Sequence, residues 1–376
     1  MLNRIRLLFL QADSQNLNPN MKKVILALCV VLAGVCVYFI EQPSASEPAI
    51  ESFRLVAWDN ANDGTICQES GMVEVRHISS GKQVMNVDYT LSPGSEITPD
   101  PKSLIEKWPE KVTFTVKNQG KTKDYTVVLA DFVSPDDQPQ GPDWKIMWND
   151  EFNSTSIDTM VWSKTPRTQS HWARKMTDAE DLYEMKDGKL FLYGKKNLNH
   201  PEDTIDHLTG GIWGRDKKCF AIGRVDVRAK MTPGKGFWPA IWLLPQGNDK
   251  PYSEGGELDM MERLNFDNFA YQTMHTRYTN LVNRANPKNY TTHPINVDDY
   301  NTYSVIVTTE KVQYLINNEV THEYPNLGIE YQFPFASNAY YVVLSSQLGG
   351  DWVGEIDLKG ETVYMSIDWV RVYTKK

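Results

Sequence analysis

Three carboxylates lie close together in the segment 255–262, which reads GGELDMME. Successive side chains of a strand alternate between its two faces, so Glu257 and Asp259 share one face. A regular strand would place Glu262 on the opposite face. We therefore expect a β-bulge at Met260–Met261, because a bulge absorbs one residue and returns Glu262 to the acidic face.

Neighbouring carboxylates repel one another, so such a row persists where it is solvated, metal-bound or functional. The functional interpretation is hydrolysis of a glycosidic bond. Glu257 would attack the anomeric carbon, Glu262 would protonate the leaving oxygen, and a gap of about 5–5.5 Å between them gives retention. Asp259 would hold one neighbour protonated. The alternatives are an exposed acidic edge and a calcium site.

Composition narrows the class of ligand. The formal net charge is −9, and no block rich in Lys and Arg follows the first 25 residues. This argues against a nucleic-acid partner, which needs cations for its phosphates. The chain has 11 Trp and 18 Tyr, and their rings stack well on the apolar faces of sugars. The alternative is that these rings fill β-sandwich cores.

The N-terminal region has the pattern of a targeting segment. Residues 1–46 are expected to contain an upstream extension followed by a signal peptide that begins at Met21. The apolar run Val24–Ile40 is followed by small residues at 44–46. An uncleaved membrane anchor is the alternative, since 17 apolar residues approach the length of a span. We expect export to the periplasm, cell surface or medium of a bacterium, and a monomer.

The rest of the sequence predicts an all-β protein in two parts. Short strands separated by turn residues predict a small Ig-like β-sandwich at 47–133, which we interpret as an accessory domain. A Pro-rich linker follows at 134–142. Residues 143–376 carry many more strand patterns, and these fit a large two-sheet β-jelly roll with a catalytic cleft on one sheet.

The second part resembles family 16 of the glycoside hydrolases, which includes laminarinases, lichenases, agarases, carrageenases and endo-galactosidases. The family signature E-[IL]-D-[IV]-x-E resembles residues 257–262. Further similar pieces occur in the family's order. They are WNDEF at 148–152, DGKL at 187–190, GRVDVRAK at 223–230, GFWPAIWLLP at 236–245 and IDWVRVY at 367–373. The resemblance implies a concanavalin-like jelly roll.

The resemblance also implies roles for residues outside the acidic segment. A sugar would stack on Trp238, and His275 would lie beside the central Asp. Other residues that would line the cleft are Trp213, Arg215, Gln347 and Trp352, with ordinary packing as the alternative. Trp242 would lie in the core. The family often binds a structural calcium ion at positions that match Glu151, Gly188 and Asp368, and a calcium-free salt-bridge network is the alternative.

The expected activity is endo-hydrolysis of β-1,3 or β-1,4 linkages with retention and without a required cofactor. Two departures from the family pattern concern the substrate. Residues 301–307 lack the His and Trp of H-x-Y-x-x-x-W, and residues 251–256 replace W-P-x-S-G. They argue against a standard laminarin or lichenan preference and point slightly toward a galactose-containing glycan, including mucin-type chains. The expected substrate is therefore either a β-glucan, the commonest substrate class, or a galactose-containing glycan. A transglycosylase and a non-catalytic carbohydrate-binding protein are the competing functions.

Overall fold

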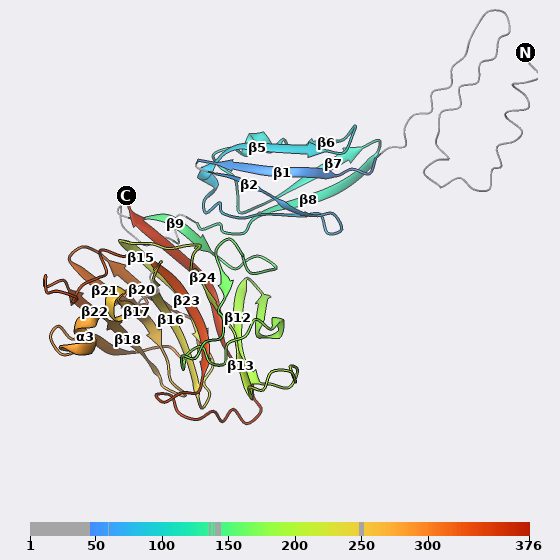
Figure 1. Cartoon of the computed structure of the whole chain (residues 1–376). Coiled ribbons are helices and arrows are strands. Elements are labelled where there is room, and N and C mark those ends of the chain that lie inside the picture. The colour runs from blue at the N-terminus through green and yellow to red at the C-terminus, as the bar shows by residue number, and fades with distance from the viewer. Residues whose placement is uncertain (1–45, 59, 135–136, 138, 140–143, 248–251) are drawn as a thin grey trace, which may run out of the picture.

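The computed structural model describes residues 46–376 except 59, 135–136, 138, 140–143 and 248–251. The predicted signal peptide or anchor lies outside the described residues, as does much of the predicted linker. Within the described part, no helix is both long and apolar enough to cross a membrane. Regular structure there is almost entirely β, as the strand patterns predict (Figure 1).

The first part of the described chain is a small sandwich of two sheets. Their strand orders are β2-β1-β5 and β3-β4-β8-β7-β6, and β4 runs parallel to β8. The strands are β1 (Ile50–Ala57), β2 (Ala61–Asp63), β3 (Thr65–Cys67), β4 (Met72–Val75), β5 (Val84–Leu91), β6 (Glu96–Thr98), β7 (Lys111–Asn118) and β8 (Lys121–Leu129). Trp108, Phe53 and Phe114 pack in its core. Its assignment as an Ig-like accessory domain stays a prediction.

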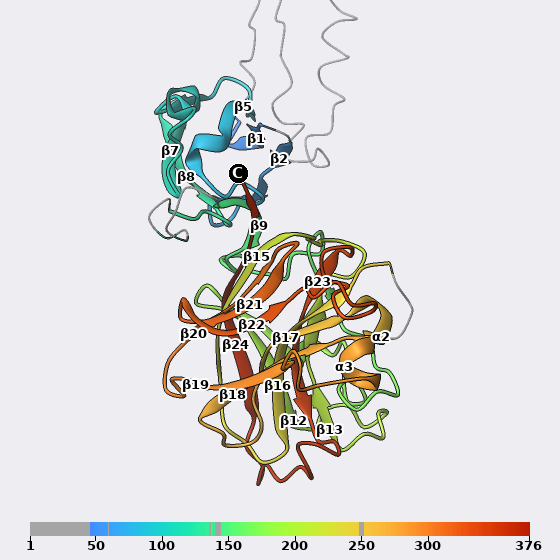
Figure 2. The same ribbon diagram turned by 90° about the vertical axis from the view of Figure 1, so that its left-hand side faces the viewer.

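The second part is built from a seven-stranded and a nine-stranded sheet. The seven-stranded sheet has the order β10-β14-β23-β16-β17-β18-β19. Its strands are β10 (Ser163–Lys164), β14 (Gly211–Trp213), β16 (Phe237–Pro245), β17 (Glu257–Glu262), β18 (Phe269–His275), β19 (Tyr290–Pro294) and β23 (Tyr340–Leu348). The short helices α2 (Tyr252–Gly255) and α3 (Arg277–Leu281) lie near each other at its edge (Figure 2).

The nine-stranded sheet follows the order β11-β12-β24-β15-β20-β21-β22, and β13 and β9 pair with β12 and β24 respectively. Its strands are β9 (Trp144–Asp150), β11 (Tyr183–Lys186), β12 (Lys189–Lys196), β13 (His207–Thr209), β15 (Gly223–Met231), β20 (Asn301–Val307), β21 (Lys311–Ile316), β22 (Glu319–Pro325) and β24 (Val363–Lys375). The predicted jelly roll is thus confirmed as a two-sheet fold.

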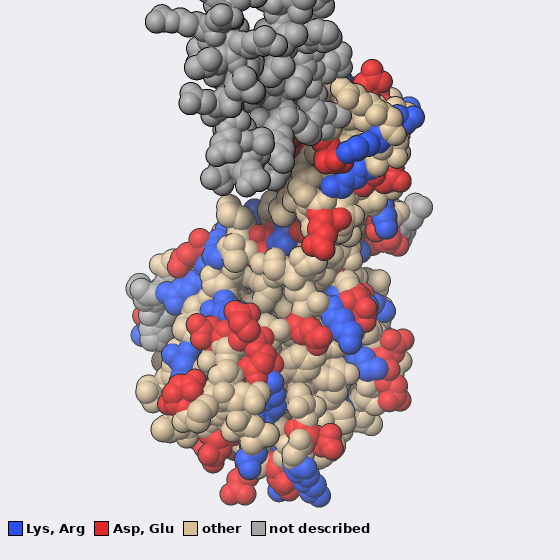
Figure 3. Space-filling model, turned by 90° about the vertical axis from the view of Figure 1, so that its right-hand side faces the viewer, with Lys and Arg blue, Asp and Glu red and all other residues tan. Residues whose placement is uncertain are grey.

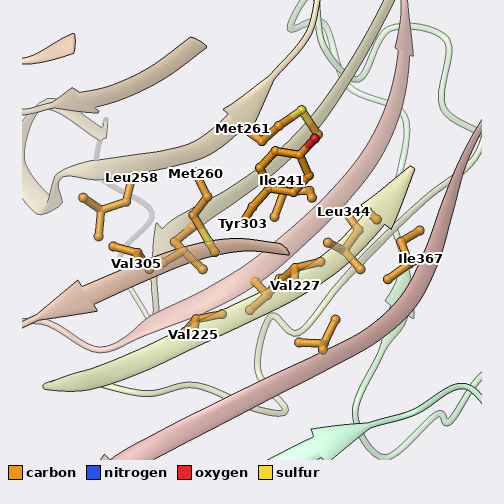
Figure 4. Packing of buried hydrophobic residues seen from close by; sticks show 14 of the residues in the cluster. Val225, Val227, Ile241, Leu258, Met260, Met261, Tyr303, Val305, Leu344 and Ile367 are labelled. Atoms are coloured by element: carbon orange, nitrogen blue, oxygen red, sulfur yellow. The ribbon is translucent and has the colours of Figure 1, made fainter. Parts of the chain in front are cut away.

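The main core lies between these two sheets. Alternate residues of each strand turn inward, and the inner faces join in one cluster of buried side chains. Figure 4 shows Val225 and Val227 of β15 near Leu258 and Met260 of β17. The opposite face of the seven-stranded sheet is therefore left free to carry polar and aromatic groups.

The small sandwich contacts the jelly roll through polar groups. Arg76 Nη2 donates to the carbonyl oxygen of Ser156 at 3.1 Å, and His77 Nε2 lies 3.2 Å from Asp158 Oδ2. Asn149 Nδ2 donates to the carbonyl oxygen of Asp131 at 2.8 Å. These contacts join β9 and the loop after it to the segments that follow β4 and β8.

Two buried carboxyls lie at this junction. Burial, together with the charge of Asp150, raises the pKa of Asp131 well above its usual range. Burial also raises the pKa of Asp150 to about 6, although the Phe152 N–H and Trp162 Nε1 both donate to it at 2.8 Å. Both carboxyls are thus more readily protonated in the folded chain than in the unfolded chain.

We predict that Asp131→Asn stabilises the chain selectively at alkaline pH. A raised carboxyl pKa contributes stability that is present at low pH and lost as pH rises through the folded-state value. The free energy of unfolding should rise by about 1–3 kcal/mol at pH 8 and change little at pH 4.5. Chemical unfolding at the two pH values measures this, with the exposed Asp88→Asn as control. An Asp131→Asn chain less stable at pH 8 would contradict the prediction.

Candidate active site

The central strand β17 contains the predicted irregularity. In the pairing of β17 with β16, Met261 lies opposite Ile241, and Asp259 lies opposite the next residue, Trp242. Met260 is therefore the extra residue of the bulge. The pairing with β18 is irregular over the same stretch, between Asp259 and Glu262. The predicted bulge is therefore confirmed, and it restores Glu262 to the face that carries Asp259.

The bulge separates apolar from acidic side chains. Leu258, Met260 and Met261 are fully buried in the core between the sheets (Figure 4). The carboxyls lie on the other face, where Asp259 is 3% exposed and Glu262 is 9% exposed. The acidic-edge alternative is thus wrong, because these two carboxyls are almost completely removed from solvent.

This burial changes the protonation of all three acids. Burial and the charge of Asp259 raise the pKa of Glu257 well above its usual range. Burial raises the pKa of Asp259 to about 7, and burial with the Asp259 charge raises that of Glu262 to about 8. An ionised carboxyl loses hydration when buried, and a second negative charge adds repulsion. At neutral pH the group therefore keeps at least one proton.

Two side chains hold the acids in place. Trp238 Nε1 donates to Glu262 Oε1 at 2.9 Å, which favours the ionised form and partly offsets the rise in the pKa of Glu262. His275 Nε2 lies 3.2 Å from Asp259 Oδ2, and its Nδ1 lies 3.4 Å from Asn280 Oδ1. His275 therefore lies beside the central acid, where the sequence resemblance places it.

Aromatic rings surround Glu262. The rings of Trp238 and Trp352 meet edge to face at 5.4 Å, and Trp352 meets Tyr271 at 5.1 Å. Trp352 is 49% exposed, so this group offers accessible ring surface. Sequence reasoning missed Tyr271, which pairs with Glu262 across β17 and β18. Its alternation with His275 on β18 was the signal that could have found it.

A second aromatic group continues along the same sheet. Trp242 Nε1 donates to Ser345 Oγ at 3.1 Å, and its ring meets that of Trp172 edge to face at 4.8 Å. Trp213 packs in the same cluster, and the guanidinium of Arg215 lies 5.4 Å from its ring centre. Trp242 is buried, but in this separate cluster and not between the sheets. Sequence reasoning missed Trp172.

Gln347 lies opposite Trp238 in the pairing of β16 with β23. Its Nε2 donates to Ser345 Oγ at 2.8 Å, and the side chain is 2% exposed. Among the described residues, its Oε1 has no hydrogen-bond partner. A buried acceptor without a donor is costly, so this oxygen is suited to accept a hydroxyl of a bound sugar.

The acidic group also offers ligand atoms for a cation. One ligand atom each from Glu257, Asp259 and His275 lie within 4.8 Å of one another. Calcium prefers oxygen ligands only, and the imidazole argues against it here. A hydrolytic pair of carboxyls needs no metal. These ligand atoms therefore do not favour the calcium alternative for this segment.

Glu151, Gly188 and Asp368 are the residues expected to bind a structural calcium ion. They are far apart in the sequence but line one surface recess. Both oxygens of Glu151 accept from Arg371, at 3.0 and 2.8 Å, and Asp368 pairs with Arg228. Gly188 has a φ of +67° in the turn between β11 and β12. The arginines neutralise both carboxylates, so this arrangement fits the salt-bridge alternative better. The calcium site stays a prediction.

We predict that Trp238→Phe shifts the alkaline limb of the pH–activity profile upward. The pKa of Glu262, about 8, places the alkaline limb of the unmodified chain near pH 8. Loss of the Nε1 donor removes an interaction that lowers this pKa. The limb should move up by about 0.5–1 pH unit, the equivalent of one hydrogen bond.

The profile of kcat/KM measures this shift, with Trp352→Phe as the matched control because that ring does not donate to an acid in the structure. Trp238→Ala should lower kcat/KM further, by about 5–150-fold, because the stacking surface is lost as well. An unshifted limb in Trp238→Phe would mean that the indole N–H does not act on the acid.

Known proteins resemble the part of the chain that carries these acids. The family model for glycosyl hydrolases family 16 matches residues 193–371. A keratan-sulfate endo-1,4-β-galactosidase from Sphingobacterium multivorum is 31% identical over 237 residues, which cover 61% of this chain. They cover 55% of that protein, so the chain spans about half the length of this relative.

Solved structures agree in fold. One concerns endo-acting O-glycanases that human gut bacteria express to initiate mucin breakdown. It is 26% identical with a TM-score of 0.54, and the match covers 62% of this chain and all of that one. The laminarinase domain of Thermotoga petrophila is 23% identical with a TM-score of 0.55, covering 63% of this chain and all of its own. The C-terminal jelly roll of this chain is thus a domain of glycosyl hydrolases family 16.

Proposed function

We propose that the chain is a retaining endo-β-glycosidase that cleaves β-1,3 or β-1,4 linkages within a galactose-containing glycan. The observation that carries the proposal is the bulged strand β17. It places Glu257, Asp259 and Glu262 on one face, and Trp238 donates to the last of them. This arrangement provides two carboxyls for hydrolysis and a third between them.

In the first step Glu262 acts as the acid and Glu257 as the nucleophile. Glu262 holds a proton at neutral pH, because burial raises its pKa to about 8. It gives this proton to the glycosidic oxygen as the bond to the anomeric carbon breaks. A Glu257 oxygen bonds to that carbon from the opposite face, which gives a covalent glycosyl-enzyme.

The second step reverses these roles. Glu262, now ionised, takes a proton from water as the water oxygen attacks the anomeric carbon. The bond to Glu257 breaks, the sugar leaves with its original configuration, and both carboxyls return to their starting forms. No cofactor is required. Asp259 shares a hydrogen bond with Glu257, and when the proton resides on Asp259 that bond stabilises the ionised nucleophile.

The substrate class rests on two kinds of observation. The relative that is 31% identical acts on keratan sulfate as an endo-1,4-β-galactosidase, and the solved structure that is 26% identical concerns O-glycanases of mucin breakdown. The chain also departs from the laminarinase pattern at 251–256 and 301–307. We therefore favour galactose-containing glycans, including mucin-type O-glycans, over β-glucans.

The competing functions differ in what they do with the acids. A transglycosylase would use the same carboxyls but pass the sugar to a second sugar. A binding protein would not need three adjacent acids, two of them buried, since burying a charge is costly. Export to the bacterial envelope also belongs to the proposal, supported by the N-terminal sequence pattern alone, and a monomeric state stays an expectation.

We predict that the two glutamates fail differently when replaced by alanine. Glu257→Ala should lose nearly all activity, and azide should partly restore it with inverted product configuration, because the anion takes the place of the nucleophile. Glu262→Ala should fail on natural glycans yet still react with aryl glycosides, whose phenols leave without a proton. Measurement of product configuration and of burst kinetics checks both.

Chain length of the products separates the competing functions. Hydrolysis of keratan sulfate or mucin glycans should release short oligosaccharides whether or not an acceptor sugar is added. Elongated products would favour the transglycosylase, and no bond cleavage would favour the binding protein. An inverted product from the unmodified chain would overturn the assignment of Glu257.

A further inference from the structure

A recess of about 570 Å³ lies between the small sandwich and the jelly roll. Its walls come from the turn after β1, the segment between β4 and β5, the start of β5, strand β9 and the end of β24. Two loop residues, Val161 and Lys218, complete them. None of the residues that line it belongs to the acidic group or its aromatic neighbours. It is therefore separate from the cleft of the seven-stranded sheet.

The recess exposes large apolar side chains. Trp58 is 81% exposed, Met147 is 53% exposed and Met85 is 38% exposed. An indole left in water loses the free energy that burial would give, about 1.5–3 kcal/mol for a large side chain. Sugar rings have apolar C–H faces that pack on such a surface. An accessible Trp at the rim of a recess is thus suited to stack on a saccharide.

The charge of the recess differs from that of the rest of the chain. Lys82, Lys145 and Lys218 line it, and no Asp or Glu does, although the formal net charge is −9. Within the described residues, none of these three ammonium groups makes an ion pair. On the face drawn in Figure 3, in contrast, acidic and basic side chains are interspersed. The recess is therefore a local cationic region.

Uncharged donors complete the lining. Gln83 Oε1 accepts from the Ser79 N–H at 3.0 Å, and its Nε2 has no partner among the described residues. Trp148 also lines the recess, is 8% exposed, and carries an Nε1 that lacks an acceptor in the part of the chain described. His77, a further lining residue, is already paired with Asp158. Trp148 Nε1 is buried with the ring in the core, so the donors that a ligand rich in oxygen acceptors would meet are the Gln83 amide and the three ammonium groups.

We propose that this recess is a second glycan-binding site, which takes an acidic saccharide with a sulfate or carboxylate group. Trp58 stacks on a sugar ring, and the three lysines bind the anionic group. A concave site with a single exposed indole fits one or two sugar residues better than a flat lipid surface. The site goes beyond the proposed hydrolysis and would hold an anionic glycan beside the catalytic jelly roll.

The test is binding to the full-length chain by isothermal titration calorimetry. The probes are lactose 6′-sulfate, 3′-sialyllactose and neutral lactose, and the first two distinguish sulfate from carboxylate. We expect at least one acidic probe to bind and lactose to bind at least about tenfold more weakly. Affinity should fall as the salt concentration rises, because the ion pairs are screened.

Three variants place the binding. Trp58→Ala should weaken binding of the acidic probe by about tenfold or more. Lys145→Gln combined with Lys218→Gln should remove most of the salt dependence, and Lys117→Gln on the exposed face of β7 is the matched control. Trp238→Ala should leave this binding unchanged, which excludes the cleft. Turnover of a neutral soluble substrate should not change in the Trp58 and lysine variants.

The proposal is overturned if the unmodified chain binds neither acidic probe at concentrations up to about 10 mM, the weak limit for a specific site. It is also overturned if Trp58→Ala, with an unchanged melting temperature, binds as tightly as the unmodified chain. Binding to vesicles of anionic lipid but not to the saccharides would point to a membrane surface instead. Because the experiment measures binding, its result tests the second site independently of the proposed hydrolysis.

Discussion

Everything at the site depends on the cost of holding three carboxyls side by side with two of them buried. Asp259 and Glu262 are almost completely buried, and each acid raises the free energy of ionising the next. This cost provides a proton at neutral pH without a metal, since a buried carboxyl keeps its proton when a neighbour is charged. The bulge at Met260 makes the arrangement possible, because it lets the core keep both methionines while the acids stay together.

The two sheets of the jelly roll have different roles. The nine-stranded sheet supplies one wall of the core, and the seven-stranded sheet supplies the other and carries the acids on its outer face. Trp238 then has two tasks on that face, since its ring offers a stacking surface and its N–H reaches Glu262. Gln347 lies directly across from it with an acceptor that lacks a donor in the described part of the chain. The proposed sugar contacts and the proposed acid are thus adjacent because of strand register.

Strand alternation and the E-x-D-x-x-E spacing were enough to predict the all-β fold, the bulge and the shared face of the acids. Alternation with His275 on β18 could also have pointed to Tyr271. Trp172 could not be predicted, because it lies in a turn and its contact with Trp242 joins residues that are far apart in the sequence. Local sequence also could not decide between calcium and salt bridges at Glu151, since the partner Arg371 is 220 positions away in the chain. Local sequence could not predict the polar junction between the small sandwich and the jelly roll either, because its partners, such as Arg76 and Ser156, are far apart in the chain.

The last strand of the chain has a consequence for how the protein is made. β24 pairs with β15 on one side, and with both β12 and β9 on the other. Until residues 363–375 have been synthesised, the first strand of the jelly roll has no partner and the nine-stranded sheet lacks its middle. The small sandwich is complete by residue 129 and forms earlier, in keeping with domain-wise folding during synthesis. The jelly roll can complete its fold only after β24 has been synthesised, and its many contacts between distant residues favour slow folding.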